Sequence, residues 1–217
     1  MCKKEIFKRY LLFIVSLFIS GLGVAFAKHG ELGVTPISSV ANVMSYEFKF
    51  LTLGNWLIIW NFLLILGQVL ILRKKFQTIQ LLQIPISFLF GWFTDIGVAI
   101  IEKIPVGSYF MKLTMVIIGM IVLAFGISLS VTANVIMNSG EAFVKAISDV
   151  SKKDFGNIKI IFDVLCVALA VVLSLIFFDF RIIGTREGTI VSAIFTGAIV
   201  KFFNKYTQKN INKILIK

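Results

Sequence analysis

Charge is scarce in this sequence of 217 residues: only 15% of them are Asp, Glu, Lys or Arg, against about 25% in a typical soluble domain. Hydrophobic residues make up 58%, and the mean hydropathy is +0.95. A chain of this length cannot hide such a composition in a water-soluble core, because much of its surface stays exposed. The composition therefore excludes intrinsic disorder, argues against a soluble enzyme and predicts a membrane protein.

Cysteine and histidine are equally scarce, with two Cys and one His. Cys2 and Cys166 lie too far apart to suggest a metal site or a disulfide framework, and His29 cannot form a histidine metal site alone. Residues 184–189 superficially resemble a phosphate loop but lack its lysine. The sequence also contains no nucleophile–base constellation and no nucleotide fingerprint. We therefore predict no enzymatic activity, no metal and no cofactor.

Long apolar runs are abundant. A helix that spans a membrane needs about 20 mostly apolar residues, and six runs qualify, the last of them short. They cover residues 10–27, 55–72, 81–101, 113–136, 158–178 and 188–203. The sequence predicts an all-α membrane protein with a single transmembrane domain over residues 1–217 and six spans. Five or seven spans are the alternatives.

Basic residues are unevenly distributed between the connections, and the net charge is +11. They cluster in residues 3–9, 73–75, 145–159 and 201–217, whereas each alternate connection carries only two. Cytoplasmic loops are enriched in Lys and Arg, so we expect both termini to be cytoplasmic. Contact with anionic lipid head groups, rather than with nucleic acid, explains the excess charge.

The N-terminus allows a second interpretation. Basic residues, an apolar run and then residues 25–27 (Ala-Phe-Ala) resemble a cleavable secretory signal. An internal repeat that includes this span argues that it is retained.

The repeat relates three separate segments of each half of the chain. Residues 54–61 align with 156–163 at an offset of 102, residues 23–26 with 126–129 at 103, and residues 87–91 with 193–197 at 106. Repeat 1 covers about 10–101 and repeat 2 about 113–203, each with three spans. An odd number of crossings inverts the second repeat, as in secondary transporters that bind solute near the midplane. The alternative is a duplicated helix hairpin without a transport role.

Each repeat also contains a short helical segment after its first span. In the first repeat, the glycines and the proline of residues 30–36 end the spanning helix. The apolar residues that follow share one helical face; they are Ile37, Val40, Ala41 and Met44. In the second, residues 138–148 occupy the equivalent place. Stretches of 10–14 residues are too short to span and fit re-entrant or interfacial helices. Their N-termini would attract anionic groups. Amphipathic helices lying on opposite bilayer surfaces are the alternative.

Polar residues at membrane depth supply the candidate binding residues. A carboxylate there costs at least about 2.5–3.5 kcal/mol and should face protein or a wet cavity. Interhelical hydrogen bonds that hold the bundle together are one alternative role, and a position nearer the membrane interface is another for Asp95 and Asp163. Gln68 and Gln83 are further polar residues of this kind. The predicted substrate-binding residues are Asn61 and its repeat equivalent Asp163, together with Asp95, Glu141, Asn42 and Asn134.

Short glycine and proline motifs give the chain a resemblance to the YczE/YyaS/YitT-type bacterial integral membrane proteins, from about Tyr10 to Phe203. The motifs are residues 21–25, 32–36, 54–56, 88–95 and 184–189, followed by Gly197. The resemblance implies a multi-span protein of the bacterial cytoplasmic (inner) membrane, with transport as a common expectation. It implies no catalytic residues.

These patterns favour a transporter or solute-binding membrane protein that works by alternating access between inverted repeats. Its partners would be the lipid bilayer and a small solute, anionic if the helix N-termini contact it, with a homodimer or a partner subunit left open. One alternative is the substrate-binding subunit of an energy-coupling vitamin importer, which would dock through small residues such as Ser16 and Ser20. The other is a non-transporting membrane partner or sensor protein.

Overall fold

The computed structural model describes residues 3–216, so Met1, Cys2 and Lys217 lie outside the described residues. Within that range the chain is helical, and its one strand-like feature is an isolated bridge between Gly33 and Thr185. The predicted all-α class is confirmed. The helices are α1 (Lys3–His29), α2 (Pro36–Glu47), α3 (Leu53–Leu72), η1 (Arg73–Lys75), η2 (Thr78–Leu82), α4 (Gln83–Ile101), α5 (Tyr109–Ala133), α6 (Ser139–Ser151), α7 (Phe155–Phe177) and α8 (Glu187–Ile216).

Within residues 3–216, five stretches are long and apolar enough to cross a membrane. They are Lys3–His29, Leu53–Lys75, Thr78–Ile101, Tyr109–Ala133 and Phe155–Phe177. The prediction of several membrane-spanning helices is confirmed by these five. The predicted sixth span, residues 188–203, lies in α8, which is outside this set. A sixth crossing therefore stays a prediction.

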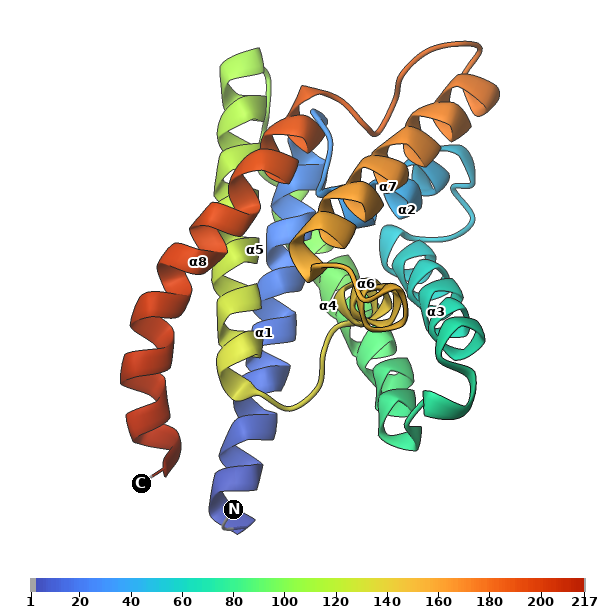
Figure 1. Ribbon diagram of the computed structural model, residues 1–217. Coiled ribbons are helices and arrows are strands. Elements are labelled where there is room, and N and C mark those ends of the chain that lie inside the picture. The colour runs from blue at the N-terminus through green and yellow to red at the C-terminus, as the bar shows by residue number, and fades with distance from the viewer. Residues whose placement is uncertain (1–2, 217) are drawn as a thin grey trace.

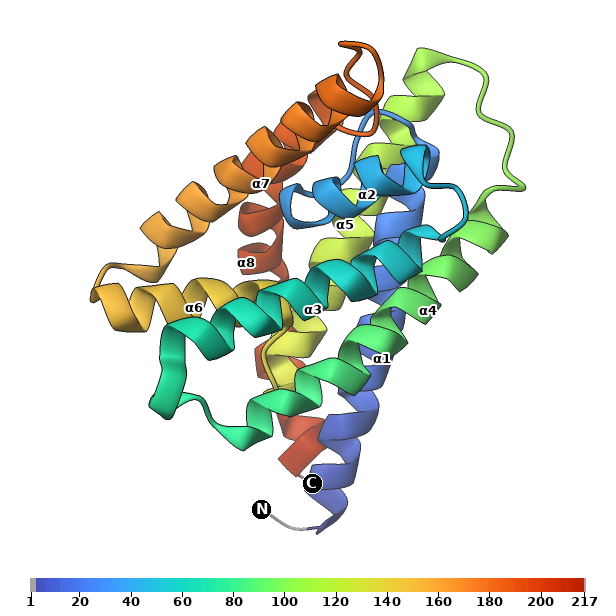
Figure 2. The ribbon, with the colours of Figure 1, turned by 90° about the vertical axis from the view of Figure 1, so that its right-hand side faces the viewer.

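The helices form two layers (Figures 1 and 2). One contains α8, α5, α1 and α4 in that order, and the other contains α7, α2, α6 and α3. At the centre of the first layer, α1 and α5 run antiparallel, since the Arg9 guanidinium near the start of α1 donates to the Ala133 carbonyl at the end of α5, at 3.2 Å. The second layer contains both short helices.

Small residues allow α1 and α5 to approach closely. A Cβ atom on Gly23 would lie only 2.5 Å from the backbone nitrogen of Leu123, and one on Gly126 would collide with Ser20. Small residues at such seams let membrane helices pack backbone to backbone. The two contacts also correspond to each other: Gly126 lies 103 residues after Gly23, and Leu123 lies 103 residues after Ser20.

The outer helices of the first layer also follow a common pattern. A Cβ atom on Gly21 of α1 would lie 2.9 Å from the nitrogen of Thr94, and one on Gly97 would lie 3.0 Å from the Cβ of Ala25, so α4 runs along α1 in the same direction. In the other half, the Phe125 and Phe203 rings lie 5.3 Å apart, and the Ser128 and Thr207 hydroxyls lie 2.7 Å apart. α8 therefore runs parallel to α5, as α4 runs parallel to α1.

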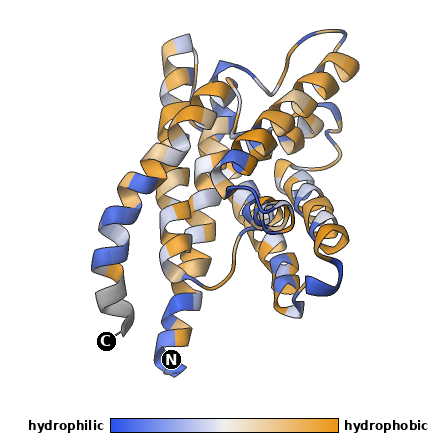
Figure 3. Cartoon of the chain, viewed as in Figure 1, coloured by the Kyte–Doolittle hydropathy of each residue, from blue (hydrophilic) through white to orange (hydrophobic). Residues whose placement is uncertain are grey.

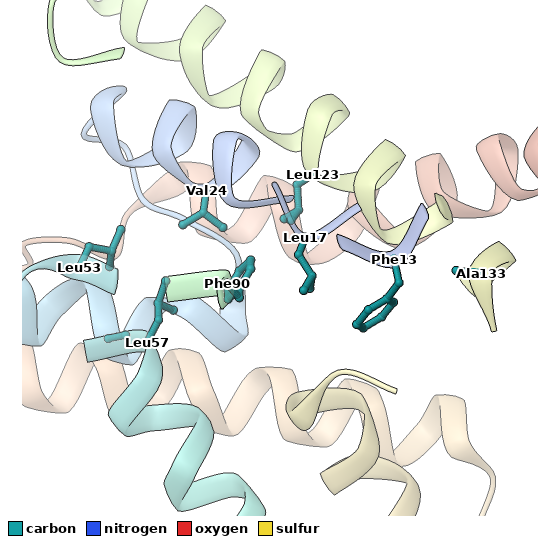
Figure 4. Close-up of a cluster of buried hydrophobic side chains, with 9 residues drawn as sticks. Phe13, Leu17, Val24, Leu53, Leu57, Phe90, Leu123 and Ala133 are labelled. Atoms are coloured by element: carbon teal, nitrogen blue, oxygen red, sulfur yellow. The ribbon is translucent and has the colours of Figure 1, made fainter. Parts of the chain in front are cut away.

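A buried apolar cluster joins the two layers (Figure 4). Its members come from α1, α2, α3, α4 and α5. They are Phe13, Leu17, Val24, Ala41, Leu53, Leu57, Phe90, Leu123 and Ala133. Many large apolar side chains are exposed instead, for example Ile160, Val164 and Ile176 of α7. In a membrane these outward surfaces would face the acyl chains.

The connections gather at two opposite ends of the bundle. In Figure 2 the α3–α4 connection lies at the lower left, the α6–α7 connection at the left and both termini at the bottom, whereas the α4–α5 and α7–α8 connections lie at the upper right and top. Hydrophilic residues colour the lower ends of α1 and α8 in Figure 3. The basic residues of the N-terminus, of the α3–α4 connection and of the C-terminal part of α8 therefore lie toward one end of the bundle.

Candidate functional site

The first turn of α6 is the centre of the candidate site. α5 ends at Asn134, which adopts the left-handed conformation (φ 50°, ψ 46°) and turns the chain. The new helix begins after Asn138, whose side-chain oxygen accepts a hydrogen bond from the Ser139 amide at 3.0 Å. The first amides of a helix have no partner within the helix. Asn138 satisfies one of them and leaves this turn attractive to an acceptor.

Asn61 of α3 lies directly against this turn. The Ser139 hydroxyl donates to the Asn61 side-chain oxygen at 2.6 Å, and Asn61 is only 4% exposed. The side-chain nitrogen of Asn61 has no partner among the described residues. A buried donor without an acceptor costs about 1–3 kcal/mol. Asn61 is therefore prepared to donate to a ligand that brings an acceptor.

A pair of buried glutamines fixes the position of Ser139. Gln68 and Gln83 exchange two hydrogen bonds between their amide groups, at 3.0 and 3.1 Å. Gln68 also donates to the Ser139 carbonyl at 3.1 Å. Because every bond in this group is buried, it holds α6 against α3 more firmly than exposed contacts could.

Three ionisable residues lie beyond Asn61. Glu141, in the first turn of α6, is half-buried and makes no hydrogen bond or ion pair with any described residue. Burial raises the pKa of Glu141; the positive charge of Lys159 opposes this rise, and the negative charge of Asp163 adds to it. On α7, Lys159 and Asp163 form an ion pair one helical turn apart. We call Asn61, Ser139, Glu141, Lys159 and Asp163 the central site.

The first turn of α2 meets the first turn of α6. A Cβ atom on Gly140 would lie 2.9 Å from the terminal carbon of Ile37, so glycine allows this contact. α2 begins with Pro36, as the sequence predicts, and proline is suited to this position because its missing amide proton is not needed there. Two helix N-termini, each with a positive partial charge, therefore face one another.

A second polar group lies where two connections cross. The Asn42 side chain donates to the Gly184 carbonyl at 2.7 Å, and Gly33 bridges Thr185. Gly33 has φ +107°, and a Cβ atom there would collide with Thr189. Side-chain oxygens of Asn42, Thr185 and Thr189 are buried without a partner among the described residues. These bonds attach α2 to the connection between α7 and α8.

Two predicted site residues lie away from the central site. The Asp95 carboxylate accepts from the Gly54 amide at 2.8 Å and from the Thr52 hydroxyl at 2.6 Å, so it caps the N-terminus of α3. Asn134 is exposed and ends α5. Both residues have a structural explanation that the sequence did not show.

Among the predicted residues, Asn61 contacts the first turn of α6, which also carries Glu141, and the charge of Asp163 acts on Glu141. Sequence reasoning did not select Ser139 or Lys159 as site residues. The position of Ser139 after the capping Asn138, and the four-residue spacing of Lys159 and Asp163, are the signals that could have identified them.

A family model described as a family of unknown function (DUF6198) matches residues 7–205. The chain belongs to this family. No curated protein and no solved structure matches the chain. The resemblance to the YczE/YyaS/YitT-type proteins stays a prediction, because none of these matches connects the chain to them.

The central site gives this DUF6198 chain a defined chemistry. Asn61 and the first turn of α6 offer donors, Lys159 offers a positive charge, and Glu141 offers a carboxyl without a hydrogen-bond partner among the described residues. Within residues 3–216 no group of three His, Cys, Asp or Glu residues could hold a metal ion. The arrangement can bind an acceptor-rich or anionic group and can exchange a proton.

Proposed function

We propose that the chain is a multi-pass transporter of the bacterial cytoplasmic membrane that moves a small anionic solute by alternating access. The convergence of two helix first turns beside Asn61, whose buried side-chain nitrogen has no partner, is the observation that carries this proposal. Intramembrane helix N-termini that face each other suit an anion, because each carries a positive partial charge and the first turn of α6 also leaves amides without a partner within the helix.

The architecture that we propose for this activity is two inverted repeats, α1–α4 and α5–α8, with α8 as the sixth crossing. The matching parallel pairs, α4 along α1 and α8 along α5, support it. The close contacts at the α1–α5 seam also support it. Gly23 and Gly126 are 103 residues apart, as are Ser20 and Leu123, and 103 is the offset of the sequence repeat at that segment. Each short helix also packs against the third helix of the other repeat, α2 against α7 and α6 against α3.

We further propose that both termini are cytoplasmic. Basic residues of the N-terminus, of the α3–α4 connection and of the C-terminal part of α8 share one end of the bundle, which supports this orientation. α2 and α6 would then be re-entrant helices that enter the bilayer from opposite sides, since their first turns meet inside the bundle.

A thermal-shift screen followed by uptake tests the transport proposal. The purified chain is screened against small anionic metabolites, which should raise its apparent melting temperature if they bind the native state, and each stabilising compound is then tested for uptake into proteoliposomes. Asn61→Ala should abolish stabilisation and uptake. Asn55→Ala on the exposed face of the same helix is the matched control and should keep both. Failure of every anion to bind would overturn the proposal.

The vitamin-importer subunit receives less support. It would need an exposed face of small residues around Ser16 and Ser20, but both are buried against α5. Stabilisation by a compound without uptake would nevertheless favour a binding subunit. The absence of both would favour a partner or sensor protein.

A further inference from the structure

The carboxyl of Glu141 differs from the other acidic groups of the membrane region. Asp95 accepts two hydrogen bonds at the start of α3, and Asp163 is paired with Lys159. Glu141 has neither kind of partner among the described residues and is half-buried on α6, which packs against both α3 and α7. An unpaired carboxylate at this depth is costly, so the neutral form is favoured.

The positive charge of Lys159 acts on two carboxyl groups, those of Asp163 and Glu141. Lys159 pairs with Asp163, and its charge also acts on Glu141, as does the charge of Asp163. Lysine has a long, flexible side chain and a compact ammonium group, so it can change partners without backbone movement. One cation shared by two carboxyls can fully compensate only one negative charge. The second carboxyl must therefore take up a proton or face solvent.

We infer that Glu141 is a proton-binding site coupled to solute binding, and that Lys159 exchanges between Asp163 and Glu141 as this proton is released and bound. This inference rests on the proposed transport function. In the step itself, Glu141 loses its proton to water, the Lys159 ammonium turns toward the new carboxylate, and Asp163 keeps its negative charge but loses part of its pairing. The reverse step restores the arrangement in the structure.

Within the part of the chain that the structure describes, the other residues packed around α6 do not supply another counter-charge for Glu141. α3 presents Trp60, Asn61 and Gln68 to this region, none of which is ionisable. On α6 itself, Lys145 and Asp149 form an exposed ion pair, in which the lysine Nζ lies 3.2 Å from the aspartate Oδ1. On α7, Cys166 is buried, and Lys159 and Asp163 complete the charged groups near it.

Proton binding would serve an anion transporter directly. An anion bound at Asn61 would lie near Glu141, and a carboxylate there would repel it. A protonated Glu141 removes this repulsion, so that anion and proton would bind cooperatively and move together. Release of the proton on the far side would weaken the binding of the anion, which supplies the differential affinity that coupling requires.

Infrared titration of the purified full-length chain tests the inference with the proton itself as the probe. The carbonyl stretching band of a protonated carboxyl should persist well above pH 4.3, the approximate ordinary pKa of Glu. Glu141→Gln should remove this band, and the matched control Asp149→Asn on the exposed face of α6 should keep it. A wild-type chain without the band, or a band that survives in Glu141→Gln, would overturn the inference.

Two further variants keep the test decisive if Glu141→Gln fails to fold. Asp163→Asn frees Lys159 for Glu141 and should move the titration of the band to lower pH by about one unit. Lys159→Gln removes the cation and should move the titration to higher pH. A carboxyl beyond the reach of these two charges would shift in neither variant, so unchanged titrations or shifts of the same sign would overturn the exchange of Lys159. The titration needs no solute, so its failure is distinguishable from the failure of the uptake assay.

Discussion

The two halves of the bundle are most alike at the α1–α5 seam and least alike at their short helices. At the seam, Gly23 and Gly126 make corresponding close contacts. The short helices begin in the same way, with extended capping residues Thr35 and Asn138, but they then diverge. α2 has no acidic residue in its first turn, whereas α6 places Glu141 there.

The two short helices also differ in how they are attached to the rest of the bundle. α2 is almost entirely buried, and backbone carbonyls of Cys166 and Gly184 accept from its Ser39 and Asn42 side chains. α6 has a buried face toward α3 and an exposed face with a charged pair. The comparison indicates that the first half supplies a fixed wall for the site and that the second half supplies its ionisable groups.

The largest effect is expected at the seam, where the two halves should respond equally. Gly23→Val and Gly126→Val each place side-chain atoms where neighbouring atoms already lie less than 3 Å from the added Cβ. Overpacking commonly costs about 1–3 kcal/mol and more where backbone must move. Both variants should lose most of the monodisperse protein when extracts are compared by size-exclusion chromatography.

Gly197→Ala provides the control for this pair, because nothing lies within 4 Å of a Cβ atom at that position of α8. It should be as stable as the wild type or slightly more so, since alanine favours a helix over glycine by about 1 kcal/mol. Tolerance of valine at one seam position and not at the other would contradict the likeness of the two halves.

The attachment of α6 should be more sensitive than that of α2. Gln68→Leu removes the bond to Ser139 and also leaves the buried amide of Gln83 without its partner, at a cost of about 1–3 kcal/mol. Asn42→Leu removes one bond to Gly184 from a side chain whose oxygen is already unpartnered. We expect a larger fall in the apparent melting temperature for Gln68→Leu.

A double variant sharpens this prediction. Gln68→Leu with Gln83→Leu removes both amides, so no side-chain amide is left unsatisfied, and part of the lost stability should return. If the double variant were as unstable as the sum of the two single variants, the reciprocal amide pair would not be the origin of the effect.

Much of the fold could be predicted from the sequence because the bilayer imposes a strong length and hydropathy pattern. The short helices were also predictable, since Gly30, Gly33 and Pro36 interrupt the first apolar run. Side-chain roles were less predictable. Asp95 lies about two-thirds along α4, and only the fold reveals that this part of α4 reaches the start of α3, where the carboxylate caps the helix.

The central site shows the same limit. Asn61 and Asp163 align in the repeat, but the neighbours of each depend on which short helix packs against it. Asn61 meets α6, whereas Asp163 is paired within its own helix. Each short helix packs against a long helix of the other half. This packing leaves no local sequence signal, so the hydrogen bond from Ser139 to Asn61 could not be predicted.

A smaller effect is expected from the pH dependence of α6. Burial raises the pKa of Glu141 above its unfolded value, so the folded state binds this proton more tightly than the unfolded state. The resulting stability is fully present below about pH 4.3 and is lost as the pH rises through the folded pKa. The wild-type apparent melting temperature should therefore fall over that range, and the curve of Glu141→Gln should be flatter. Asp149→Asn should keep the wild-type slope.

The smallest effect is expected at Tyr46, the half-buried ionisable group of α2. Burial, with a smaller contribution from the charge of Glu31, raises the pKa of Tyr46 to about 12, against about 10 for an ordinary tyrosine. Its stability contribution is therefore complete below about pH 10 and is lost only as the pH rises through 12. Tyr46→Phe keeps the ring over which the Lys28 ammonium lies at 5.6 Å, so at pH 7 it should change stability by less than about 0.5 kcal/mol.

Tyrosinate absorbance measures this residue directly. The chain has four tyrosines, and the wild type should show one that ionises later than the rest, which Tyr46→Phe should remove. A late phase that survives in the variant would assign it to another tyrosine and would weaken the contrast between the short helices. If the phase disappears, the late-ionising tyrosine is Tyr46 of α2, which keeps its proton at neutral pH, whereas the pKa that burial raises in α6 belongs to the carboxyl of Glu141. Proton exchange would then be confined to the half of the site that also carries Lys159 and Asp163.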